Sequence, residues 1–371
     1  MPRTRQFPIS VLFVSATSNK VGGGQISLLE LLGALDRERF APRAAVGGTG
    51  ELADAFAALN VPVTLIDMPS LRPRNIVRYV RSIQRLARLA RSERVDVIHS
   101  NDPRAHLYTG PAAWWARVPA VFHYRVSYSD GVYDRFVPMM CSKLVAVSRS
   151  VANRFRGASG KVEVIENGVD MNCFHAGAQG DGLPADVRSH APLIGTIGRL
   201  ERAKGIHDFI EAISILKKSH PGIGAVIVGR DTNGEGKQLV ELCARLEVTD
   251  NVVFVDASDD IASLLAALDV YVLLSDNEGL NRSIIEAMSC ETPVVATAVG
   301  GNSEVIADND VGRLVPYEDP AAAAAAIDEL VGNPELRSAM GREARNRIAA
   351  RFSLARHKER MEALFASLAG G

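Results

Sequence analysis

The segment VYVLLSDNEGLNRSIIEAMSCETPVVAT, residues 270–297, decides the fold because it holds one strand–helix–strand unit. Its two ends are short, apolar and rich in valine, as buried strands are. The part between them begins as a polar, Gly-containing loop and continues as a helix. Two strands joined through a helix run parallel in the sheet. The segment therefore predicts a parallel sheet of the α/β class.

The same alternation of strands and helices extends over the whole chain, which indicates parallel sheets covered by helices on both faces. Two sets of strands predict two Rossmann-like domains. Helical patterns lie at 25–35, 51–59, 74–92 and 104–116, and Asp319-Pro320 and Asn333-Pro334 predict two further helix starts. The strand-like runs are 9–16, 43–48, 61–67, 95–100, 119–126, 143–148 and 162–168, followed by 192–200, 224–230, 251–257, 270–275, 293–300 and 312–317.

A length of 371 residues also favours two domains. Residues 1–190 carry 24 Lys and Arg against 16 Asp and Glu, whereas the remainder carries 18 against 27. This split suggests that the first half meets an anionic partner. We expect domains at 1–180 and 190–350, joined by the polar, Gly-rich segment 175–192. The C-terminal helix, about 352–368, is a candidate to pack back on the first domain.

The composition excludes several classes of protein. With 47% hydrophobic and 23% charged residues the chain is globular, and it has no apolar run of about 20 residues that could span a bilayer. A basic start followed by an apolar run resembles a signal peptide, but residues 9–16 are short and β-branched and are interpreted as the first strand. The four cysteines lack the spacing of a zinc site or a disulfide framework, so we expect a cytoplasmic protein.

In open parallel sheets, ligands bind beyond the carboxyl ends of the strands, so the loops there are the candidate sites. Gly22, Gly23 and Gly24 precede an amphipathic helix, where free backbone N–H groups could bind an anion; a flexible turn is equally consistent. His123 ends a strand and could contact a substrate hydroxyl or phosphate, or transfer a proton. It could also be a satisfied polar residue. His99 holds a similar position with a weaker claim.

Arg199 and Lys204 follow the first strand of the second half, five residues apart. Two cations in one strand–helix loop suit a diphosphate, although a solvated basic loop is the commoner case. Glu278 precedes Gly279, whose missing side chain lets a ligand approach the backbone. Glu286 fits a capping box with Ser283 as N-cap. Alternatively, the helix begins earlier and Glu286 reaches the site from its first two turns.

At this point the residues resemble a family, the retaining family 4 glycosyltransferases with the GT-B fold. The match is carried by SDNEGLNRSIIEAMSCETPVVATAVGGNSEVI, residues 275–306, which has the family's E-x7-E pattern in Glu278 and Glu286, then EAM, PVVAT and GG-x-x-E. GRLERAKGIHDFIEA, residues 198–212, resembles the R-x4-K donor loop. VIENGVDMNCF and LVAVSRSVANRF, residues 164–174 and 144–155, resemble the interdomain segment and the elements before it.

The resemblance implies two Rossmann-like domains whose parallel sheets face a central cleft. Arg199 and Lys204 would hold the diphosphate of a nucleotide-sugar, and Glu278 would accept hydrogen bonds from the hydroxyls of its sugar. Glu286 would bind the ribose. The backbone N–H groups near the sugar and phosphate would be those of Gly279, Leu280 and Asn281.

The remaining roles are implied in the same way. Gly22, Gly23 and Gly24 would line the phosphate and acceptor side, and His123 would face the donor sugar. The base would lie against Gly229, Arg230, Val255 and Asp256. The chain departs from the family at Glu291, where glycine is usual, and at VDAS, residues 255–258, where a phenylalanine–glycine or leucine–glycine pair is common.

The chemistry implied is front-face displacement, in which the leaving phosphate oxygen takes the proton of the acceptor. No metal and no cofactor is implied, because fixed cations and helix N-termini neutralise the UDP or GDP leaving group. Asp308-Asn309-Asp310 mimics the DxD of metal-dependent transferases but is discounted because it sits in a turn.

The resemblance implies a hexosyl- or N-acetylhexosaminyltransferase of cell-surface polysaccharide or glycoconjugate biosynthesis. Its acceptor would be a glycan, a lipid-linked molecule or a small molecule. The alternatives are a sugar-nucleotide epimerase on the same fold and a non-catalytic sugar-nucleotide binder, since fold alone does not fix the reaction. A NAD-dependent dehydrogenase is disfavoured because GxGxxG is absent.

Residues 72–95 contain eight arginines and one acid. Five arginines recur every three or four residues, which places them on one helical stripe: Arg74, Arg78, Arg81, Arg85 and Arg88. The stripe is either a solvated helix face or, over residues 72–94, a peripheral contact with an anionic membrane at its inner face. Nucleic acid is not expected, because no known nucleic-acid-binding motif is present. Trp114 and Trp115 are expected in the core.

Overall fold

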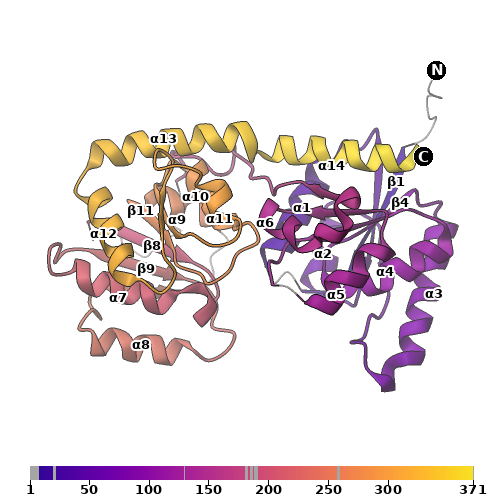
Figure 1. The fold of residues 1–371 in the computed structure, drawn as a ribbon, viewed down its shortest axis with the longest axis horizontal. Helices are drawn as coiled ribbons and strands as arrows, with labels where there is room; N and C mark the ends of the chain where they lie inside the picture. Colours follow the sequence, from indigo (N-terminus) through magenta and orange to yellow (C-terminus); the bar gives the residue numbers. More distant parts are fainter. Residues whose placement is uncertain are drawn as a thin grey trace. The chain divides into compact units, whose positions relative to one another are not determined.

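The computed structural model describes residues 8–19, 22–128, 130–179, 183, 187, 191–256 and 260–370. It divides into two compact units, Met1–Gly168 with Leu354–Gly371 and Val169–Ser353 (Figure 1). The division falls at residue 168 rather than near 180. Of the segment expected to be a linker, 180–182, 184–186 and 188–190 lie outside the described residues.

The first unit is built on a parallel sheet of seven strands in the order β3-β2-β1-β4-β5-β6-β7. Its strands are β1 Ile9–Ser15, β2 Phe40–Val46, β3 Val63–Leu65, β4 Val97–Ser100, β5 Ala120–Tyr124, β6 Lys143–Ala146 and β7 Val162–Val164. Its α-helices are α1 Gly23–Ala34, α2 Glu51–Ala58, α3 Ile76–Ser92, α4 Pro103–Ala116, α5 Gly131–Phe136, α6 Arg149–Ala152 and α14 Leu354–Ala369. Short 3₁₀ helices are η1 Pro73–Asn75, η2 Val137–Met140 and η3 Asn153–Lys161.

The strand order places the helices of the first unit in two layers. The chain moves one way along the sheet through α1 and α2 and the other way through α3 to α6, and right-handed crossovers put these two groups on opposite faces. Helix α14, from the far end of the chain, packs on α1, β1 and β4. Phe365 and Met361 of α14 are buried in the same core as Phe13 and Leu28. The last helix thus completes the first hydrophobic core.

The second unit repeats this plan with six parallel strands in the order β10-β9-β8-β11-β12-β13. Its strands are β8 Leu193–Ile197, β9 Gly224–Val228, β10 Val252–Val255, β11 Val270–Leu273, β12 Val294–Thr297 and β13 Arg313–Val315. Its helices are η5 Arg202–Lys204, α7 Ile206–Leu216, α8 Gly236–Arg245, α9 Ile261–Ala267, α10 Arg282–Ser289, α11 Asn302–Val305, α12 Pro320–Val331 and α13 Pro334–Arg351. The seven and six strands expected from the sequence are all present.

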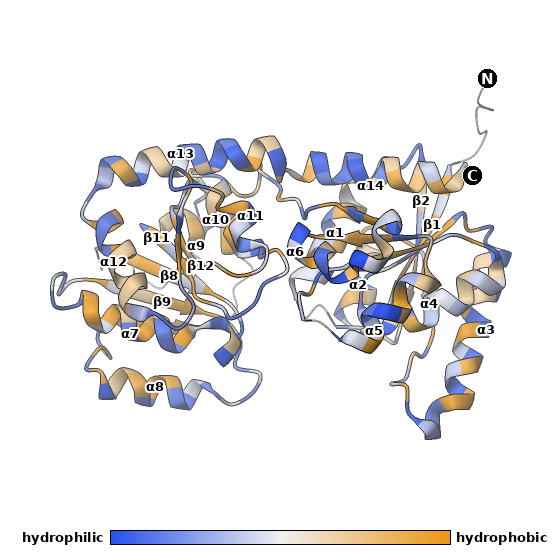
Figure 2. Ribbon diagram, in the orientation of Figure 1, coloured by the Kyte–Doolittle hydropathy of each residue, from blue (hydrophilic) through white to orange (hydrophobic). Residues whose placement is uncertain are grey.

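The elements form where burial and capping both favour them. Strands of both units are hydrophobic along their length (Figure 2), as parallel strands buried on both faces must be. The two predicted helix starts are confirmed: Asp319 accepts a hydrogen bond from Ala322 N, and Asn333 accepts one from Leu336 N. No helix among the described residues is long and apolar enough to cross a membrane.

The two tryptophans contradict the expectation of a core position. Trp114 is 83% exposed and Trp115 is 44% exposed, at the end of α4. Small residues of the same helix, Ala112 and Ala113, make the buried contacts instead. The sequence pattern was misleading because α4 is amphipathic only weakly and aromatic residues usually go inside.

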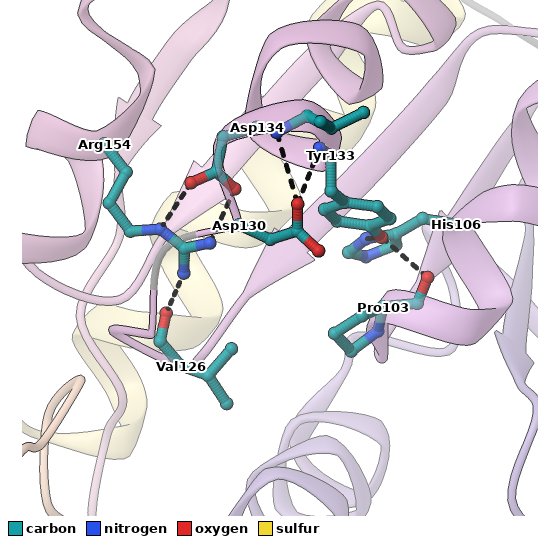
Figure 3. A network of polar contacts seen from close by, with 8 residues as sticks. Pro103, His106, Val126, Asp130, Tyr133, Asp134 and Arg154 are labelled. Carbon is teal, nitrogen blue, oxygen red and sulfur yellow. Dashed lines mark hydrogen bonds and ion pairs between the residues drawn. The ribbon is translucent and has the colours of Figure 1, made fainter.

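A buried ion pair joins α5 to η3 (Figure 3). Arg154 donates from Nη2 to Asp134 Oδ1 at 2.6 Å and from Nε to Oδ2 at 3.2 Å, and its Nη1 donates to the Val126 carbonyl at 2.6 Å. Both side chains are less than 10% exposed. The pair fixes α5 against η3 and the loop that follows β5.

We expect Asp134→Asn to lower the free energy of unfolding by about 3–5 kcal/mol, because it leaves the buried Arg154 guanidinium without its counter-charge. The matched control is Asp67→Asn. Its pair with Arg78 is half exposed and should contribute at most about 1 kcal/mol. Urea denaturation of both variants measures the difference. Equal losses would show that the burial of the Arg154–Asp134 pair has no energetic consequence.

Candidate functional site

The second sheet has a topological switch point between β8 and β11. Strands β9 and β10 lie on one side of this pair, and β12 and β13 lie on the other. Ligands of open α/β sheets bind beyond the carboxyl ends of the strands at such a point. The two loops that leave it are 198–205 and 274–281, and they contain most of the residues singled out in the sequence.

Lys204 and Glu278 meet across this switch point. Lys204 Nζ donates to Glu278 Oε1 at 2.7 Å, and Ser275 Oγ donates to the same oxygen at 2.9 Å. The Lys204 side chain is 21% exposed and that of Glu278 is 10% exposed. The structure thus joins two residues, 74 apart in sequence, into one partly accessible cluster of a fixed cation and a fixed carboxylate.

Gly205 brings Lys204 to this position. Its φ is 65°, and a Cβ there would lie 2.0 Å from the carbonyl oxygen of Leu274, at the end of β11. Only glycine allows both the left-handed turn and this approach. The backbone after β8 therefore packs directly on the end of β11, and the preceding lysine points at the loop that carries Glu278.

Two glycines after β12 support the other loop. Gly300, with φ of 50°, and Gly301 would place a Cβ 1.8 Å and 2.1 Å from the carbonyl oxygens of Glu278 and Gly279. Gly301 N donates to the Glu278 carbonyl at 3.0 Å. The GG pair of the sequence motif thus packs its backbone directly against the backbone of Glu278 and Gly279.

Arg199 lies at the end of β8 but is not part of this cluster. Its guanidinium pairs with Glu201 Oε1 at 2.7 Å, and its side chain is 53% exposed. The structure therefore does not bring the two predicted cations together in the way that it joins Lys204 to Glu278. An exposed arginine can still turn toward a phosphate, because the pair with Glu201 is accessible to solvent.

Helix α10 corrects the capping box. Its N-cap is Asn281, whose Oδ1 accepts a hydrogen bond from Ile284 N at 3.3 Å. Ser283 is therefore inside the helix, and Glu286 lies in its second turn. Glu286 Oε1 instead accepts bonds from Arg282 Nε at 2.9 Å and Nη2 at 2.5 Å, in a buried pair. The alternative expectation, in which the helix already contains Arg282, is the one observed.

The backbone at Glu291 adopts the conformation expected of the glycine that is usual at this position. Its φ is 62°, in the left-handed region that favours glycine. The turn that follows α10 is therefore the same turn that a glycine would make at this position, with a strained residue in it.

The residues expected near the base lie along the same edge of the sheet. Gly229 N donates to the Val255 carbonyl at 3.0 Å, and Leu200 N donates to the Arg230 carbonyl at 3.0 Å. A Cβ at Gly229 would lie 1.8 Å from the Gly198 carbonyl oxygen. Asp256 follows β10 and is exposed, while Leu280 is buried beside the switch point. The carboxyl ends of β8, β9 and β10 thus lie next to the Lys204–Glu278 cluster. We call the residues expected near the base, Gly229, Arg230, Val255 and Asp256, the ledge.

The first sheet has its own switch point, between β1 and β4. Gly22 is the N-cap of α1, which begins at Gly23. Asn101, directly after β4, donates from Nδ2 to the Gly24 carbonyl at 3.1 Å and accepts from Arg125 Nε at 3.1 Å. Gly23 and Gly24 thus belong to the first turn of α1 rather than to a loop before it, and their polar neighbours are the Asn101 amide and the Arg125 guanidinium bonded to that amide.

His123 lies in β5 and is 1% exposed. Its Nδ1 is 3.2 Å from His99 Nε2 and 3.4 Å from Arg125 Nη2. Burial lowers the pKa of His123 well below its usual value, and the charge of Arg125 lowers it further. The imidazole is therefore neutral at neutral pH, with one ring nitrogen able to donate a hydrogen bond and the other able to accept one.

Four polar residues at these edges were not singled out as site residues in the sequence: Asn101, Arg125, Ser275 and Arg282. Each directly contacts a predicted residue or its loop. Asn101 and Ser275 could have been found, since each lies just after a strand of a switch point. Arg282 could not, because its role depends on where α10 begins.

The comparisons with known proteins agree with this division. Residues 185–347 match the family model described as Glycosyl transferases group 1, and residues 21–172 match that described as Glycosyltransferase Family 4. The first covers the loops of the second switch point. The second covers the glycine loop, Asn101 and His123.

Among curated proteins, the chain is 32% identical over 211 residues to the lipopolysaccharide core biosynthesis mannosyltransferase LpcC of Rhizobium leguminosarum, covering 56% of this chain and 60% of that protein. It is 32% identical over 232 residues to the D-inositol 3-phosphate glycosyltransferase of Salinispora tropica, covering 57% and 48%. The matches thus span about half the length of these relatives.

Among solved structures, Anabaena Alr3699/HepE in complex with UDP and glucose has a TM-score of 0.82 at 22% identity, over 97% of this chain and 100% of that one. A glycosyltransferase from Rickettsia africae has a TM-score of 0.85 at 21% identity, over 97% and 98%. These likenesses concern the fold, and they agree with the two parallel sheets described above. The chain has the GT-B fold, and its first and second parts match, in order along the sequence, the family models Glycosyltransferase Family 4 and Glycosyl transferases group 1.

Proposed function

We propose that this protein is a retaining glycosyltransferase that moves a sugar from a UDP- or GDP-linked donor to a glycan, lipid-linked or small-molecule acceptor. The observation that carries the proposal is the Lys204–Glu278 cluster at the switch point of the second sheet. A cation suited to a phosphate and a carboxylate suited to sugar hydroxyls lie side by side where α/β sheets bind ligands.

The residues around the Lys204–Glu278 cluster complete a donor site. Lys204, with Arg199 turned inward, neutralises the diphosphate, while the backbone N–H groups of Gly279, Leu280 and Asn281 lie near the sugar and phosphate. Glu286 offers a carboxylate to the ribose from α10, and Arg282 fixes its orientation. The base rests on the ledge of Gly229, Arg230, Val255 and Asp256.

The first unit would then bind the acceptor. Gly22, Gly23 and Gly24, at the N-terminus of α1, lie next to Asn101 and Arg125 at the carboxyl edge of the sheet. His123 is buried behind that edge as a neutral imidazole. The relatives named after lipopolysaccharide core biosynthesis favour a role in cell-surface polysaccharide or glycoconjugate synthesis.

In the proposed reaction the acceptor hydroxyl oxygen forms a bond to the anomeric carbon, and the bond from that carbon to the phosphate oxygen breaks on the same face. The proton of the hydroxyl passes to the leaving phosphate oxygen. Charge on the diphosphate is stabilised by the fixed cations. The chemistry requires neither a metal nor a cofactor, and it suits a hexosyl or an N-acetylhexosaminyl donor.

A peripheral contact of residues 72–94 with the inner face of an anionic membrane is part of the proposal. The arginine stripe is solvent-exposed, since Arg74 of η1 and Arg81, Arg85 and Arg88 of α3 are exposed. Arg78 of the same stripe pairs with Asp67. Such a basic helix is attracted to anionic lipid by about 1 kcal/mol per cation near the surface.

A thermal-shift screen tests donor binding. A nucleotide-sugar at 100 times its dissociation constant should stabilise the chain by about 2.7 kcal/mol, and we expect a shift with UDP- or GDP-sugars. Glu286→Ala should reduce that shift, whereas Glu241→Ala, an exposed carboxylate on α8, should not. A protein that no UDP- or GDP-sugar stabilises would contradict the proposal. Donor turnover without any acceptor requirement would instead indicate an epimerase, and binding without turnover a silent binder.

A further inference from the structure

Exposed large apolar side chains are unevenly distributed over the described residues. Twelve of the fifteen lie between Leu65 and Met139 in the first unit, and three lie in the second. The most exposed of them are Trp114 at 83%, Met139 at 73% and Val132 at 71%. Contiguous apolar surface of this kind marks a site of interaction with another molecule or a membrane.

We use the name tryptophan patch for five of these side chains, which lie at the end of α4 and along α5 and η2: Trp114, Trp115, Val132, Phe136 and Met139. Trp114 and Met139 line the same groove of about 380 Å³. Val132, Phe136 and Met139 follow one another at three- or four-residue spacing along α5 and η2, so they lie on one side of these helices. The patch therefore runs from the end of α4 along α5 and η2.

The helices that carry the patch are held rigidly. A Cβ at Gly110 of α4 would lie 2.7 Å from Met140 Cβ of η2, so the two elements approach closely. Tyr133 Oη of α5 donates to the Pro103 carbonyl at the start of α4 at 2.6 Å, and the Arg154–Asp134 pair secures the far side of α5 (Figure 3). Since its supports are locked, the patch is a preformed surface.

The surroundings of the patch are strongly basic. Residues 103–161 contain nine Lys and Arg against two Asp and Glu, and the buried pair of Arg154 with Asp134 accounts for one charge of each sign. Arg91, in the last turn of α3, donates to the Trp115 carbonyl. The apolar patch is thus continuous with cations, including those of α3.

We propose that the tryptophan patch enters the interface of an anionic lipid bilayer, with the aromatic and methionine side chains at the headgroup–acyl boundary and the arginines on the lipid phosphates. Tryptophan is enriched at this boundary because its ring is apolar and its N–H is polar. Monotopic proteins combine apolar insertion with basic attraction in this way. A second copy of the chain is a poorer occupant, because two basic faces repel each other. The proposal deepens the membrane contact proposed for residues 72–94 and rests on it, but it assigns insertion to different residues.

The chain contains two tryptophans in all, and both lie in the patch. The intrinsic fluorescence of the full chain therefore reports on the patch without a label. We expect vesicles of phosphatidylcholine with phosphatidylglycerol to shift the tryptophan emission to the blue, and lipids with brominated acyl chains to quench it. Vesicles of phosphatidylcholine alone should have a much smaller effect. Flotation of the protein with the same vesicles measures binding in parallel.

Met139→Asp and Phe136→Asp should each lower partitioning into the anionic vesicles by about tenfold or more, because they place a charge where an apolar side chain inserts. The matched control is Val240→Asp, which changes a half-exposed valine on α8 of the second unit and should leave partitioning unchanged. Because these side chains are exposed, all three variants should unfold at the same temperature as the native chain. Nucleotide-sugar binding by the second unit should also be unaltered.

Flotation without a change in tryptophan emission would overturn the patch and leave the contact through residues 72–94 standing. An absence of flotation would overturn both membrane proposals. An emission shift that depends on protein concentration without lipid would assign the patch to self-association and overturn the proposal as well. Each of these outcomes is independent of whether the protein binds a nucleotide-sugar, so it is distinguishable from failure of the proposed enzyme activity.

Discussion

Lys204→Ala should lower turnover by about 10²–10³-fold while the fold remains intact. The ammonium is held at the switch point by Glu278 at 2.7 Å, where the diphosphate charge of a departing nucleotide would develop. Removal of one fixed donor from a comparable site costs about 2.7–4 kcal/mol of transition-state stabilisation. The ion pair is partly exposed, so its loss should have only a modest effect on stability.

The measurement is turnover of a nucleotide-sugar that stabilises the protein in the thermal-shift screen. Lys237→Ala is the matched control, because this lysine of α8 is 87% exposed and should retain full activity. Glu278→Ala and the double variant Lys204→Ala/Glu278→Ala complete a cycle. If the pair acts as a unit, the double variant should be little worse than either single one. Near-native turnover of Lys204→Ala would remove the basis for the proposed function.

Acidification should destabilise the first unit steeply below pH 6.5. His99, His106 and His123 are buried there. Burial lowers the pKa of His106 to about 3, and burial followed by the charge of Arg125 lowers the pKa values of His99 and His123 well below 6.5. All three imidazoles therefore stay neutral in the folded chain at pH values where the unfolded chain is protonated.

The sign of the effect follows from proton binding. Between pH 6.5 and the folded pKa, the unfolded chain binds protons that the folded chain excludes, so the free energy of unfolding falls as the pH falls. Each such histidine contributes about 1.4 kcal/mol per pH unit. The three together should lower stability by about 4 kcal/mol between pH 7.5 and pH 5.5, and they contribute no pH dependence well above 6.5.

Urea denaturation at a series of pH values measures this slope. His99→Leu should flatten it by about one third, because a buried neutral group replaces one of the three imidazoles. Unfolding free energies that are equal at pH 7.5 and pH 5.5, or slopes that are equal in the native chain and the variant, would contradict the expectation.

The sequence by itself determined the class of fold and the positions of most elements. Strand length, valine content and polar loops predicted seven and six parallel strands, and all are present. Such features are local, because the apolar pattern and the β-branched residues of one short segment already indicate a buried strand. The same is true of the helix starts at Asp319 and Asn333, where the capping side chain and its partner are three residues apart.

The loops that hold the candidate site were also predictable, since the carboxyl ends of parallel strands are a place that alternation alone identifies. Their internal arrangement was not. Whether Arg199 or Lys204 meets Glu278 depends on the turn at Gly205 and on the pairing of β8 with β11, which are separated by more than 70 residues. Residue spacing carries no information about such a pairing.

Tertiary structure likewise decided between readings of single residues that the sequence left open. Glu286 is the partner of Arg282 because α10 is capped by Asn281 and begins at Arg282, rather than being capped by Ser283. Trp114 became a surface residue because α4 packs through Gly110 and small neighbours, which leaves no room beneath it for an indole. Local chemistry specifies which elements form, whereas the direction in which a side chain points is decided by the close packing of elements that are distant in the chain.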